Sequence, residues 1–436
     1  MKTMIIGSGV SGLAVADYLS QNNQEYFFAK KEDVNAEKLN DIYIDSLLKD
    51  VREVVISPGV SPKKELILQI KKRKIKITGE LEFATSRISN DIIAITGTNG
   101  KTTSVSLMYF LLKELSFGVC LGGNVGVPVT GLIKKLNGNE LLILEVSSFQ
   151  LETIKNFRPD IAIVLNITED HLNRHSSMRE YIRCKYNITK NQTVDDYLLL
   201  NADDENIQKH PPRTKAKIYY FSTKRKVEGS YIKNNCIYFN DNEKEIKLAN
   251  LSKIKLKGEH NLSNILAVSL AIYLKFRNKD FLRGLPLFTG VSHRIEFVAK
   301  INGVDFYNDS KATNISSTIA AVESFKEPIN LILGGSDKGY DFDELFRKLP
   351  RNVRNIAAFG QTKNKIAFSA KMANYNNIYL CDDLEMSIRI LFKLSERGDI
   401  LLLSPACASF DLFSNFEERG NVFKKIVREI EINEGS

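Results

Sequence analysis

The sequence predicts an α/β protein in which mostly parallel sheets are divided among three domains. Short apolar runs alternate with amphipathic stretches along the whole chain, which is typical of strand–helix–strand units. Most apolar runs end in a polar or glycine-rich turn, and a chain of 436 residues is too long for one core. We place the domains at residues 1–90, 91–288 and 289–436.

The first block is predicted to be Rossmann-like. "MIIG", "YFFA" and "EVVISPG" indicate strands, and "SGLAVADYLSQNN" indicates the first helix. Between them, "IIGSGVSG" places Gly7, Gly9 and Gly12 at the spacing G-x-G-x-x-G, which cradles a diphosphate at a helix N-terminus. An NAD or FAD site would also need an acidic residue closing the second strand, where "FFAKKED" has lysines first, so an oxidoreductase is the less favoured alternative.

The second block begins with a P-loop-like signal, so it is predicted to be an ATPase-like domain with a mostly parallel sheet. "AITGTNGKTTS" leads from a strand through a glycine turn into a helix, although Ile95 stands where the strict pattern has its first glycine. Backbone N–H groups of such a turn bind phosphate, Lys101 would reach the β- and γ-phosphates, and Thr102 would face Mg²⁺. The predicted nucleotide-binding residues here are Gly97, Thr98, Asn99, Gly100, Lys101, Thr102 and Thr103.

Further segments of this block carry chemistry or define its sheet. Glu145 ends the strand "LLILE", where an ATPase places a Mg²⁺ ligand or a water-orienting carboxylate. His171 follows the strand of "IAIVLNITEDH", beside two acidic residues that favour a polar site. The segment from Gly229 to Gly258 alternates like an antiparallel insert, and "NLSNILAVSLAIYLKF" predicts the closing helix.

The third block, which is also predicted to be a Rossmann-like α/β domain, joins five short strands to polar loops. The strands lie in "VDFYND", "INLILGGSDKG", "NIAAFG", "NIYLCDD" and "DILLLSPACAS". Loops at the carboxyl ends of parallel strands carry ligands in such folds. Cations and hydroxyls on these loops predict a pocket for an anionic small molecule, formed by His293, Arg294, Lys311, Thr313, Lys338 and Ser409.

Composition narrows the class of protein. The formal charge of +9 suits phosphate ligands, and the basic runs "KKRKIK" and "KIKLK" are predicted to be solvated surface. A nucleic-acid motor is the second alternative, but no basic patch interleaved with stacking aromatics supports it. Five scattered cysteines predict free thiols, and the absence of a signal peptide or long apolar run predicts a cytoplasmic protein, without a membrane or nucleic-acid partner.

These segments, in this order, resemble the Mur ligases, the ATP-dependent amide ligases of peptidoglycan precursor synthesis. "GTNGKTT" is similar to the family's P-loop, and "SSFQLE", "NDSKATN" and "SPACASFDLFSNFEERG" resemble the member that adds D-glutamate. The resemblance implies a first domain that binds UDP-N-acetylmuramoyl-L-alanine, a central ATP-binding domain and a C-terminal domain that brings D-glutamate. It also implies two Mg²⁺ sites and a monomeric enzyme.

The resemblance further implies roles for individual residues. Catalytic roles fall to Lys101, Glu145, His171 and Lys185, with Thr102, Glu145, His171 and Lys185 (as a carbamate) as Mg²⁺ ligands. Further ATP contacts are implied for Asn261, Asn264, Arg294, Asp309 and Lys311. The UDP-substrate would contact Gly9, Val10, Ser11, Ser57, Gly59, Asn124, Ser147 and Gln150, and D-glutamate would contact Thr313, Lys338, Ser409 and Phe416. The family's uracil-side pair is replaced here by Lys30 and Lys31.

Overall fold

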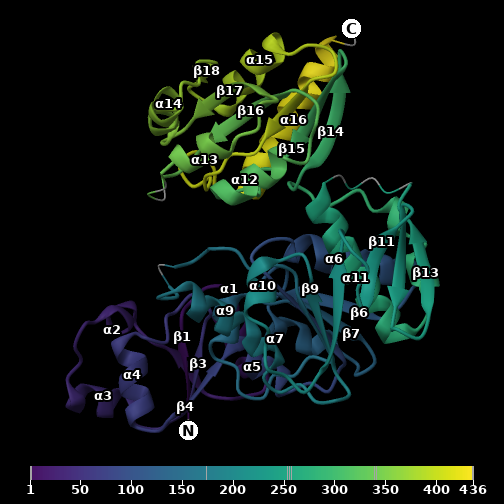
Figure 1. The fold of residues 1–436 in the computed structure, drawn as a ribbon. Helices are drawn as coiled ribbons and strands as arrows, with labels where there is room; N and C mark the ends of the chain where they lie inside the picture. Colours follow the sequence, from purple (N-terminus) through teal and green to yellow (C-terminus); the bar gives the residue numbers. More distant parts are fainter. Residues whose placement is uncertain are drawn as a thin grey trace. The chain divides into compact units, whose positions relative to one another are not determined.

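A computed structural model describes residues 2–172, 174–252, 254, 256, 258–337, 339 and 341–434 (Figure 1). The chain forms two compact units, unit 1 with Met1–Lys253 and Ser263–Pro286, and unit 2 with Ile254–Leu262 and Leu287–Ser436. Three sheets organise these units, two in unit 1 and one in unit 2. Most of their strand pairs are parallel, which confirms the predicted α/β class.

The first sheet of unit 1 is fully parallel, in the order β2-β1-β3-β4. Its core forms because the apolar side chains of Met4, Ile5 and Ile6 are completely buried. Lys71 and Lys72 are exposed at the end of a helix, as predicted for the basic run. The elements are β1 (Lys2–Ile6), α1 (Val10–Gln21), β2 (Tyr26–Phe28), α2 (Lys31–Asn35), α3 (Asp41–Leu48), β3 (Val51–Ile56), α4 (Glu65–Lys72), β4 (Lys76–Gly79) and α5 (Glu80–Thr85).

The second sheet of unit 1 has nine strands in the order β13-β12-β11-β10-β9-β8-β5-β7-β6. Strands β11, β12 and β13 pair antiparallel, which confirms the predicted insert. The strands are β5 (Ile92–Thr96), β6 (Val119–Gly123), β7 (Leu141–Glu145), β8 (Ile161–Val164), β9 (Tyr197–Asn201), β10 (Lys217–Ser222), β11 (Gly229–Lys233), β12 (Cys236–Asn240) and β13 (Glu245–Asn250).

Helical segments lie between successive strands from β5 to β10, as parallel pairing requires. In the sheet, β5 lies between β7 and β8. The turns that follow these three strands therefore meet at one edge of the sheet. The helical segments are α6 (Lys101–Glu114), α7 (Val129–Leu132), η1 (Ile133–Lys135), α8 (Ser148–Leu151), α9 (Met178–Tyr186), η2 (Asn187–Thr189), α10 (Glu205–Lys209), α11 (Glu259–Phe276), η3 (Lys279–Leu282) and η4 (Leu285–Leu287).

The sheet of unit 2 has the order β14-β15-β19-β16-β17-β18, with only β14 antiparallel among the described strands. All five predicted strands form, and β14 adds an edge. The strands are β14 (Glu296–Ile301), β15 (Val304–Asn308), β16 (Ile329–Gly334), β17 (Val353–Phe359), β18 (Ile378–Leu380) and β19 (Ile400–Leu403). The helices are α12 (Ile315–Val322), α13 (Asp343–Lys348), α14 (Lys363–Met372), α15 (Leu384–Leu394) and α16 (Phe416–Glu434).

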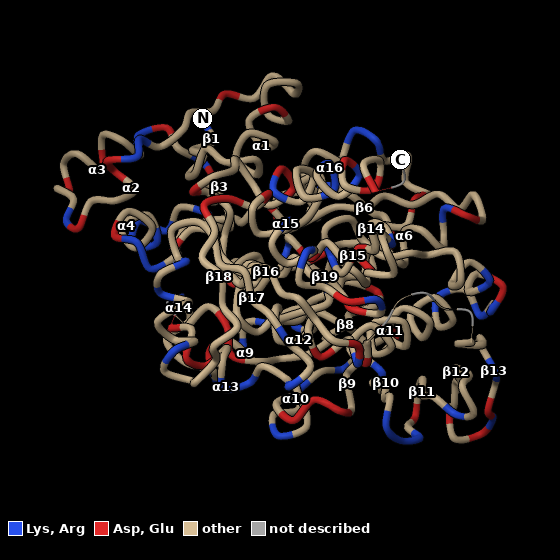
Figure 2. Tube along the Cα trace, turned by 90° about the horizontal axis from the view of Figure 1, so that it is seen from above, with Lys and Arg blue, Asp and Glu red and all other residues tan. Residues whose placement is uncertain are grey.

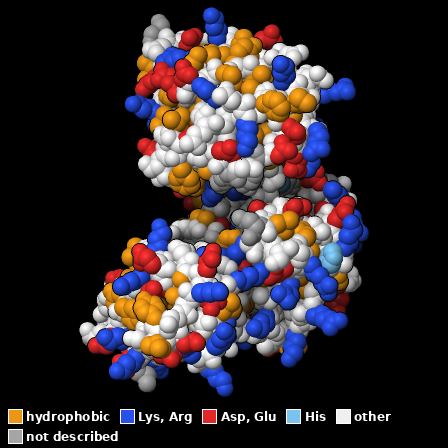
Figure 3. Space-filling model, turned by 90° about the vertical axis from the view of Figure 1, so that its left-hand side faces the viewer, with side chains coloured by type: hydrophobic (Ala, Val, Ile, Leu, Met, Phe, Trp, Pro, Cys, Tyr) orange, Lys and Arg blue, Asp and Glu red, His pale blue; other side chains and the backbone are white. Residues whose placement is uncertain are grey.

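The charged residues are distributed over both units. Lys and Arg alternate with Asp and Glu along the trace in Figure 2, and the face in Figure 3 carries both signs among apolar side chains. The five cysteines are free thiols, as predicted. Within the described part of the chain, every helix is too short or too polar to span a bilayer.

Candidate active site

The turn between β5 and α6 presents a helix N-terminus at the carboxyl edge of the nine-stranded sheet. Gly100 precedes the helix with φ +83°, a left-handed conformation that favours glycine. A Cβ atom at Gly100 would also lie 2.4 Å from the side-chain oxygen of Asn264. The structure therefore brings the predicted nucleotide residue Asn264 directly against the predicted phosphate turn.

Two lysines point their amines at the carbonyls of this turn. Lys101 Nζ donates hydrogen bonds of 2.8 Å to the carbonyl oxygens of Gly97 and Thr98. Lys185 Nζ, from α9, donates to the same Gly97 oxygen at 2.7 Å. Lys185 is 1% exposed, and burial, reinforced by the nearby charge of Lys101, lowers its pKa well below the ordinary lysine value. A buried lysine of low pKa is a neutral, nucleophilic amine over a wider pH range.

Glu145 lies at the end of β7 and is buried, with an exposed fraction of 2%. Thr102 Oγ1 donates a hydrogen bond of 2.8 Å to Glu145 Oε2, and Asn124 Nδ2 donates one of 2.9 Å to Oε1. Two predicted residues, Thr102 and Asn124, therefore share the carboxylate of a third, Glu145. A threonine hydroxyl and a carboxylate beside a phosphate-binding turn are hard oxygen donors of the kind that Mg²⁺ prefers, so these residues fit that ion.

Asn166, which was not among the predicted site residues, holds this turn through hydrogen bonds to its backbone. Asn166, just after β8, accepts from the Asn99 N–H at 2.8 Å and donates to the Asn99 carbonyl at 3.1 Å. The Thr98 hydroxyl donates to the Thr168 carbonyl at 3.1 Å. The only available signal was the position of Asn166 at the end of an apolar strand, which many structural asparagines share.

The loop after β8 contains two histidines in different environments. His171 is half exposed at φ +55°, 3.5 Å from a carboxylate oxygen of Asp170, and its ring lies 4.9 Å from that of Phe149. His175 is 1% exposed and forms a 3.0 Å hydrogen bond with the Ser148 hydroxyl. Burial lowers the pKa of His175. His171 is the histidine of this pair that is accessible to a ligand.

In the N-terminal part of unit 1, the glycine turn is packed against the turn after β3. Gly9 precedes α1, Val10 is 70% exposed, and the Ser57 hydroxyl donates to the Gly7 carbonyl at 3.1 Å. Since β1 and β2 are parallel, Lys30 follows β2 at the same sheet edge as Gly7. This edge exposes a helix N-terminus and cations to solvent.

Ser147 and Gln150 have a local structural role in the described chain. The Gln150 N–H donates to Ser147 Oγ at 3.3 Å, and the Ser147 N–H donates to Gln150 Oε1 at 2.9 Å. The two side chains therefore form a capping box at the start of α8. They lie two and five residues after Glu145, on the same edge of the sheet.

Unit 2 contains a pocket of about 480 Å³ that includes two predicted nucleotide residues, Asn261 and Arg294. Nearby, directly after β15, Asp309 is 4% exposed and accepts a 2.8 Å hydrogen bond from Ser404. Burial raises the pKa of Asp309 to about 7. The pocket is lined by Leu256, Asn261, Thr289, Gly290, Val291, Ser292, Arg294, Ile295, Glu296, Phe297 and Tyr307.

Three of the four residues predicted to bind D-glutamate lie on segments of unit 2 that meet around a buried arginine. Arg419 is fully buried and donates to the carbonyl oxygens of Ser310 at 2.8 Å, Cys407 at 3.1 Å and Ala408 at 3.1 Å. These contacts join the loops after β15 and β19 to α16, which carry Thr313, Ser409 and Phe416. Lys311 also lies 5.4 Å from the Phe416 ring, whereas Lys338 is outside the described residues.

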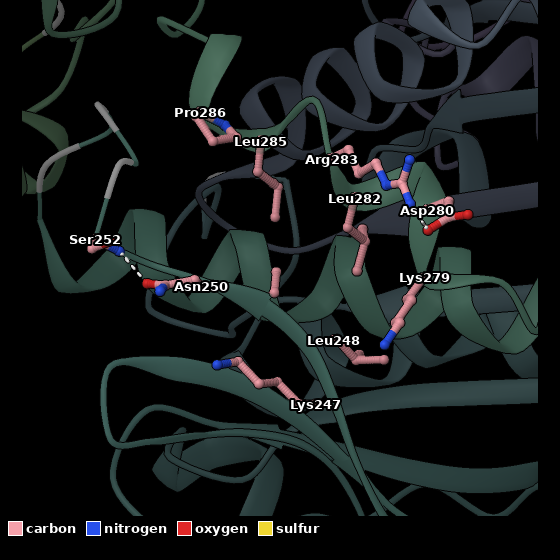
Figure 4. Close-up of a pocket in the computed structure, with 11 residues that line it drawn as sticks. Lys247, Leu248, Asn250, Ser252, Lys279, Asp280, Leu282, Arg283, Leu285 and Pro286 are labelled. Carbon is pink, nitrogen blue, oxygen red and sulfur yellow. Dashed lines mark hydrogen bonds and ion pairs between the residues drawn. The ribbon is translucent and has the colours of Figure 1, made fainter.

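A second pocket in unit 1, of about 510 Å³, lies between β13 and the segment that follows α11 (Figure 4). Its lining includes the apolar side chains of Leu248, Leu282 and Leu285 and the basic side chains of Lys247 and Lys279. None of the predicted site residues is among the described residues that line it. The predicted chemistry therefore lies outside this pocket.

Comparison with known proteins defines the class to which this fold and site belong. Residues 95–272 match the Mur ligase middle domain, and residues 293–407 match the Mur ligase glutamate ligase domain. The chain belongs to the Mur ligase family, which confirms the resemblance found in the sequence.

Curated relatives and solved structures cover nearly the whole chain. The UDP-N-acetylmuramoylalanine--D-glutamate ligases of Thermoanaerobacter pseudethanolicus and Clostridioides difficile are 40% and 39% identical, each covering 98% of this chain and of the relative. UDP-N-acetylmuramate-alanine ligase from Thermotoga maritima shares the fold, with a TM-score of 0.60, 19% identity and coverage of 98% and 99%. MurF ligase from Thermotoga maritima in complex with ADP gives a TM-score of 0.60 at 18% identity, covering 89% and 92%.

Proposed function

We propose that this protein is an ATP-dependent ligase that joins D-glutamate to UDP-N-acetylmuramoyl-L-alanine, in the cytoplasm and as a monomer. The choice of substrates is supported by the names of relatives about 40% identical over 98% of the chain. In the structure, the observation that carries the proposal is the cluster of Thr102, Asn124 and Glu145 beside the glycine turn. This cluster places a carboxylate and a hydroxyl where a nucleotide phosphate would bind.

ATP would bind with its phosphates on the turn from Gly97 to Thr103. The N-terminus of α6 supplies backbone N–H donors, and Lys101 supplies a positive charge. Asn264 adjoins this turn. Asn261 and Arg294, which line a pocket of unit 2, are proposed as further nucleotide-binding residues, together with Asp309 and Lys311 of the same unit.

Mg²⁺ would be held by Thr102 and Glu145, and a second ion by His171 with Lys185 as its carbamate. The bound ions would neutralise phosphate charge during phosphoryl transfer. Burial lowers the pKa of the Lys185 amine and so favours its unprotonated form, which is the form that adds to CO₂. Asn124 would keep the Glu145 carboxylate in a fixed orientation.

The reaction would proceed in two steps. An oxygen of the substrate carboxylate attacks the γ-phosphorus of ATP, the bond to the β-phosphate oxygen breaks, and an acyl phosphate and ADP form. The amine of D-glutamate then attacks the acyl carbon and loses a proton, and inorganic phosphate leaves. Lys101 and the backbone donors of the turn would stabilise the charge on the transferring phosphoryl group.

The two other substrates would bind at the remaining predicted residues. The diphosphate of the UDP-sugar would bind the N-terminus of α1 at Gly9, Val10 and Ser11. Ser57 and Gly59 would lie near this diphosphate. Lys30 and Lys31 would lie close to the nucleoside. D-Glutamate would bind Thr313, Ser409, Phe416 and Lys338, since its carboxylates require hydroxyl and cationic donors.

A phosphate-release assay tests this function. The protein is mixed with ATP, Mg²⁺ and UDP-N-acetylmuramoyl-L-alanine, and a panel of L- and D-amino acids is added one at a time. We expect release that depends on both the UDP-substrate and D-glutamate, with formation of the amide product by mass spectrometry. Stimulation by a different amino acid, or release without the amide, would overturn the assignment.

A further inference from the structure

We propose that Arg174 is a positioning residue that fixes the turn of residues 57–60, beside the predicted diphosphate site, against the His171 loop. This inference rests on the proposed function, because it assigns the turn to the UDP-substrate. Arg174 lies in the loop between β8 and α9, far along the chain from the turn, and its side chain is 13% exposed.

The guanidinium of Arg174 donates to three consecutive carbonyl groups of the turn. The distances are 3.3 Å to the Pro58 oxygen, 3.3 Å to the Gly59 oxygen and 3.0 Å to the Val60 oxygen. Three carbonyls in succession fix the path of the backbone more tightly than one contact could. A planar group with five N–H donors is needed for this, and a lysine amine cannot reproduce that geometry.

The guanidinium is itself held in place from α8 and the residue that follows it. Glu152 receives two hydrogen bonds from Arg174, at 2.7 Å from Nη2 and 3.2 Å from Nε. The ring of Phe149 lies 4.6 Å from the guanidinium carbon, at cation–π distance. Because Glu152 and Phe149 orient the donors, Arg174 is directed towards the turn before substrate arrives.

The turn transmits this restraint to the diphosphate site. Ser57, at its start, donates to the Gly7 carbonyl, and a Cβ at Gly7 would lie 2.8 Å from Ser57. On the side of the histidine loop, the backbone N–H of Arg174 donates a hydrogen bond of 2.9 Å to the His171 carbonyl. One side chain therefore connects the turn next to the predicted diphosphate to the loop of a predicted metal ligand.

Steady-state kinetics of Arg174→Ala and Arg174→Lys test the inference with purified full-length protein. We expect the KM for UDP-N-acetylmuramoyl-L-alanine to rise about tenfold or more in Arg174→Ala, while the KM for ATP changes by less than about twofold. Arg174→Lys keeps the charge and some donors, so its KM should lie between those of wild type and Arg174→Ala. A KM for the UDP-substrate equal to that of wild type in Arg174→Ala would overturn the inference.

Lys63→Ala is the matched control. Lys63 joins the same two parts of unit 1, through a 3.0 Å hydrogen bond to Ser176 and an ion pair with Glu180, but its side chain is 57% exposed. We expect its removal to leave both KM values within about twofold of wild type. An equal effect of Lys63→Ala would show that any contact here suffices, and would overturn the specific role of Arg174.

Glu152→Gln keeps the inference testable if Arg174→Ala does not fold. This variant leaves the turn and the arginine intact but weakens the orientation of the guanidinium, so the KM for the UDP-substrate should rise in the same direction by a smaller factor. No change in a folded Glu152→Gln protein would contradict the inference. Failure of the proposed function is distinguishable, because wild type itself would then show no D-glutamate-dependent phosphate release.

Discussion

The hydroxyl of Thr102 donates a hydrogen bond of 2.8 Å to the carboxylate of Glu145, which lies 43 residues further along the chain. The contact forms because β5 and β7 are adjacent and parallel, with Ile95 in register with Glu145. The first turn of α6 and the end of β7 therefore meet at one edge of the sheet. In the proposed function, both oxygens face the phosphates of ATP.

Replacement of Lys101 by alanine is expected to abolish amide formation while the fold persists. The amine donates hydrogen bonds to the backbone carbonyls of Gly97 and Thr98, so their loss should lower stability by about 1 kcal/mol. Loss of a charge that stabilises phosphoryl transfer should lower kcat by roughly 10²–10³-fold. Phosphate release and thermal unfolding measure the two effects, with Lys113→Ala on the same helix as the control. Near-normal turnover would refute the role of Lys101.

Replacement of Asn124 by alanine is expected to weaken Mg²⁺ binding. Asn124 orients Glu145 through a 2.9 Å hydrogen bond, and loss of such a partner lowers metal affinity by about 10–100-fold. The Mg²⁺ concentration that gives half-maximal activity should rise by that factor. If Mg²⁺ dependence is unchanged and only the KM for the UDP-substrate rises, Asn124 binds substrate instead of orienting Glu145.

Replacement of Lys185 by methionine is expected to remove activity and raise Tm. A buried amine with a lowered pKa costs stability at every pH below the unfolded value of about 10.4, and that cost shrinks as pH rises towards it. Methionine has no such cost, whereas activity should fall by roughly two orders of magnitude if a carbamate is required. NMR with ¹³C-bicarbonate should show a carbamate signal in wild type, retained in Lys190→Met and lost in Lys185→Met.

Replacement of Asp309 by asparagine is expected to change how stability depends on pH. The pKa is about 7 in the folded chain and about 3.9 unfolded, so the folded state holds one more proton between these values. Stability of wild type therefore falls as pH rises from about 4 to 7, by at most about 4 kcal/mol, and this contribution is constant above pH 7. The Tm of Asp309→Asn minus that of wild type should increase from pH 5 to 8. A constant difference would contradict the raised pKa.

Replacement of Ser409 by alanine, or of Thr313 by valine, is expected to raise the KM for D-glutamate. Each change removes one hydroxyl that would donate to a carboxylate, worth about tenfold in affinity. The KM for ATP and for the UDP-substrate should be unaffected. Ser316→Ala, an exposed position on α12, is the control. Equal rises for all three substrates would indicate a general defect instead of a glutamate contact.

Much of the fold could be predicted because local pattern and tertiary structure agree. Buried parallel strands are continuous apolar runs, so β5, β7, β16 and β19 stand out in the sequence. β6 and β10 were missed, as were β14 and β4. Lys76 and Lys300 stand on the exposed sides of β4 and β14, and the polar residues interrupt the apolar run. The antiparallel insert could be predicted because the alternation of apolar and polar residues with a period of two is also a local sequence pattern.

In the candidate site, too, some residues could be predicted from a local sequence motif, and others could not. Gly100, Lys101 and Thr102 occur together in the chain, so the sequence alone predicted a glycine turn at the start of α6 and its proposed role in phosphate binding. Arg174 and Arg419 could not be selected, because nothing near them in the sequence distinguishes them from other arginines. Their significance lies in the carbonyl groups around them, which are supplied by strand-end loops more than 50 residues away in most cases.

The sequence by itself determined the class of fold, the family and the glycine turn before α6, because these depend on short-range patterns of apolar residues and glycine. Only the tertiary structure decided that Thr102 and Asn124 share Glu145, that Lys185 is buried with a lowered pKa, and that Arg174 donates to the carbonyls of the turn after β3. Each of these depends on desolvation or on a contact between distant segments. Such properties exist only once strands are placed side by side and water is excluded.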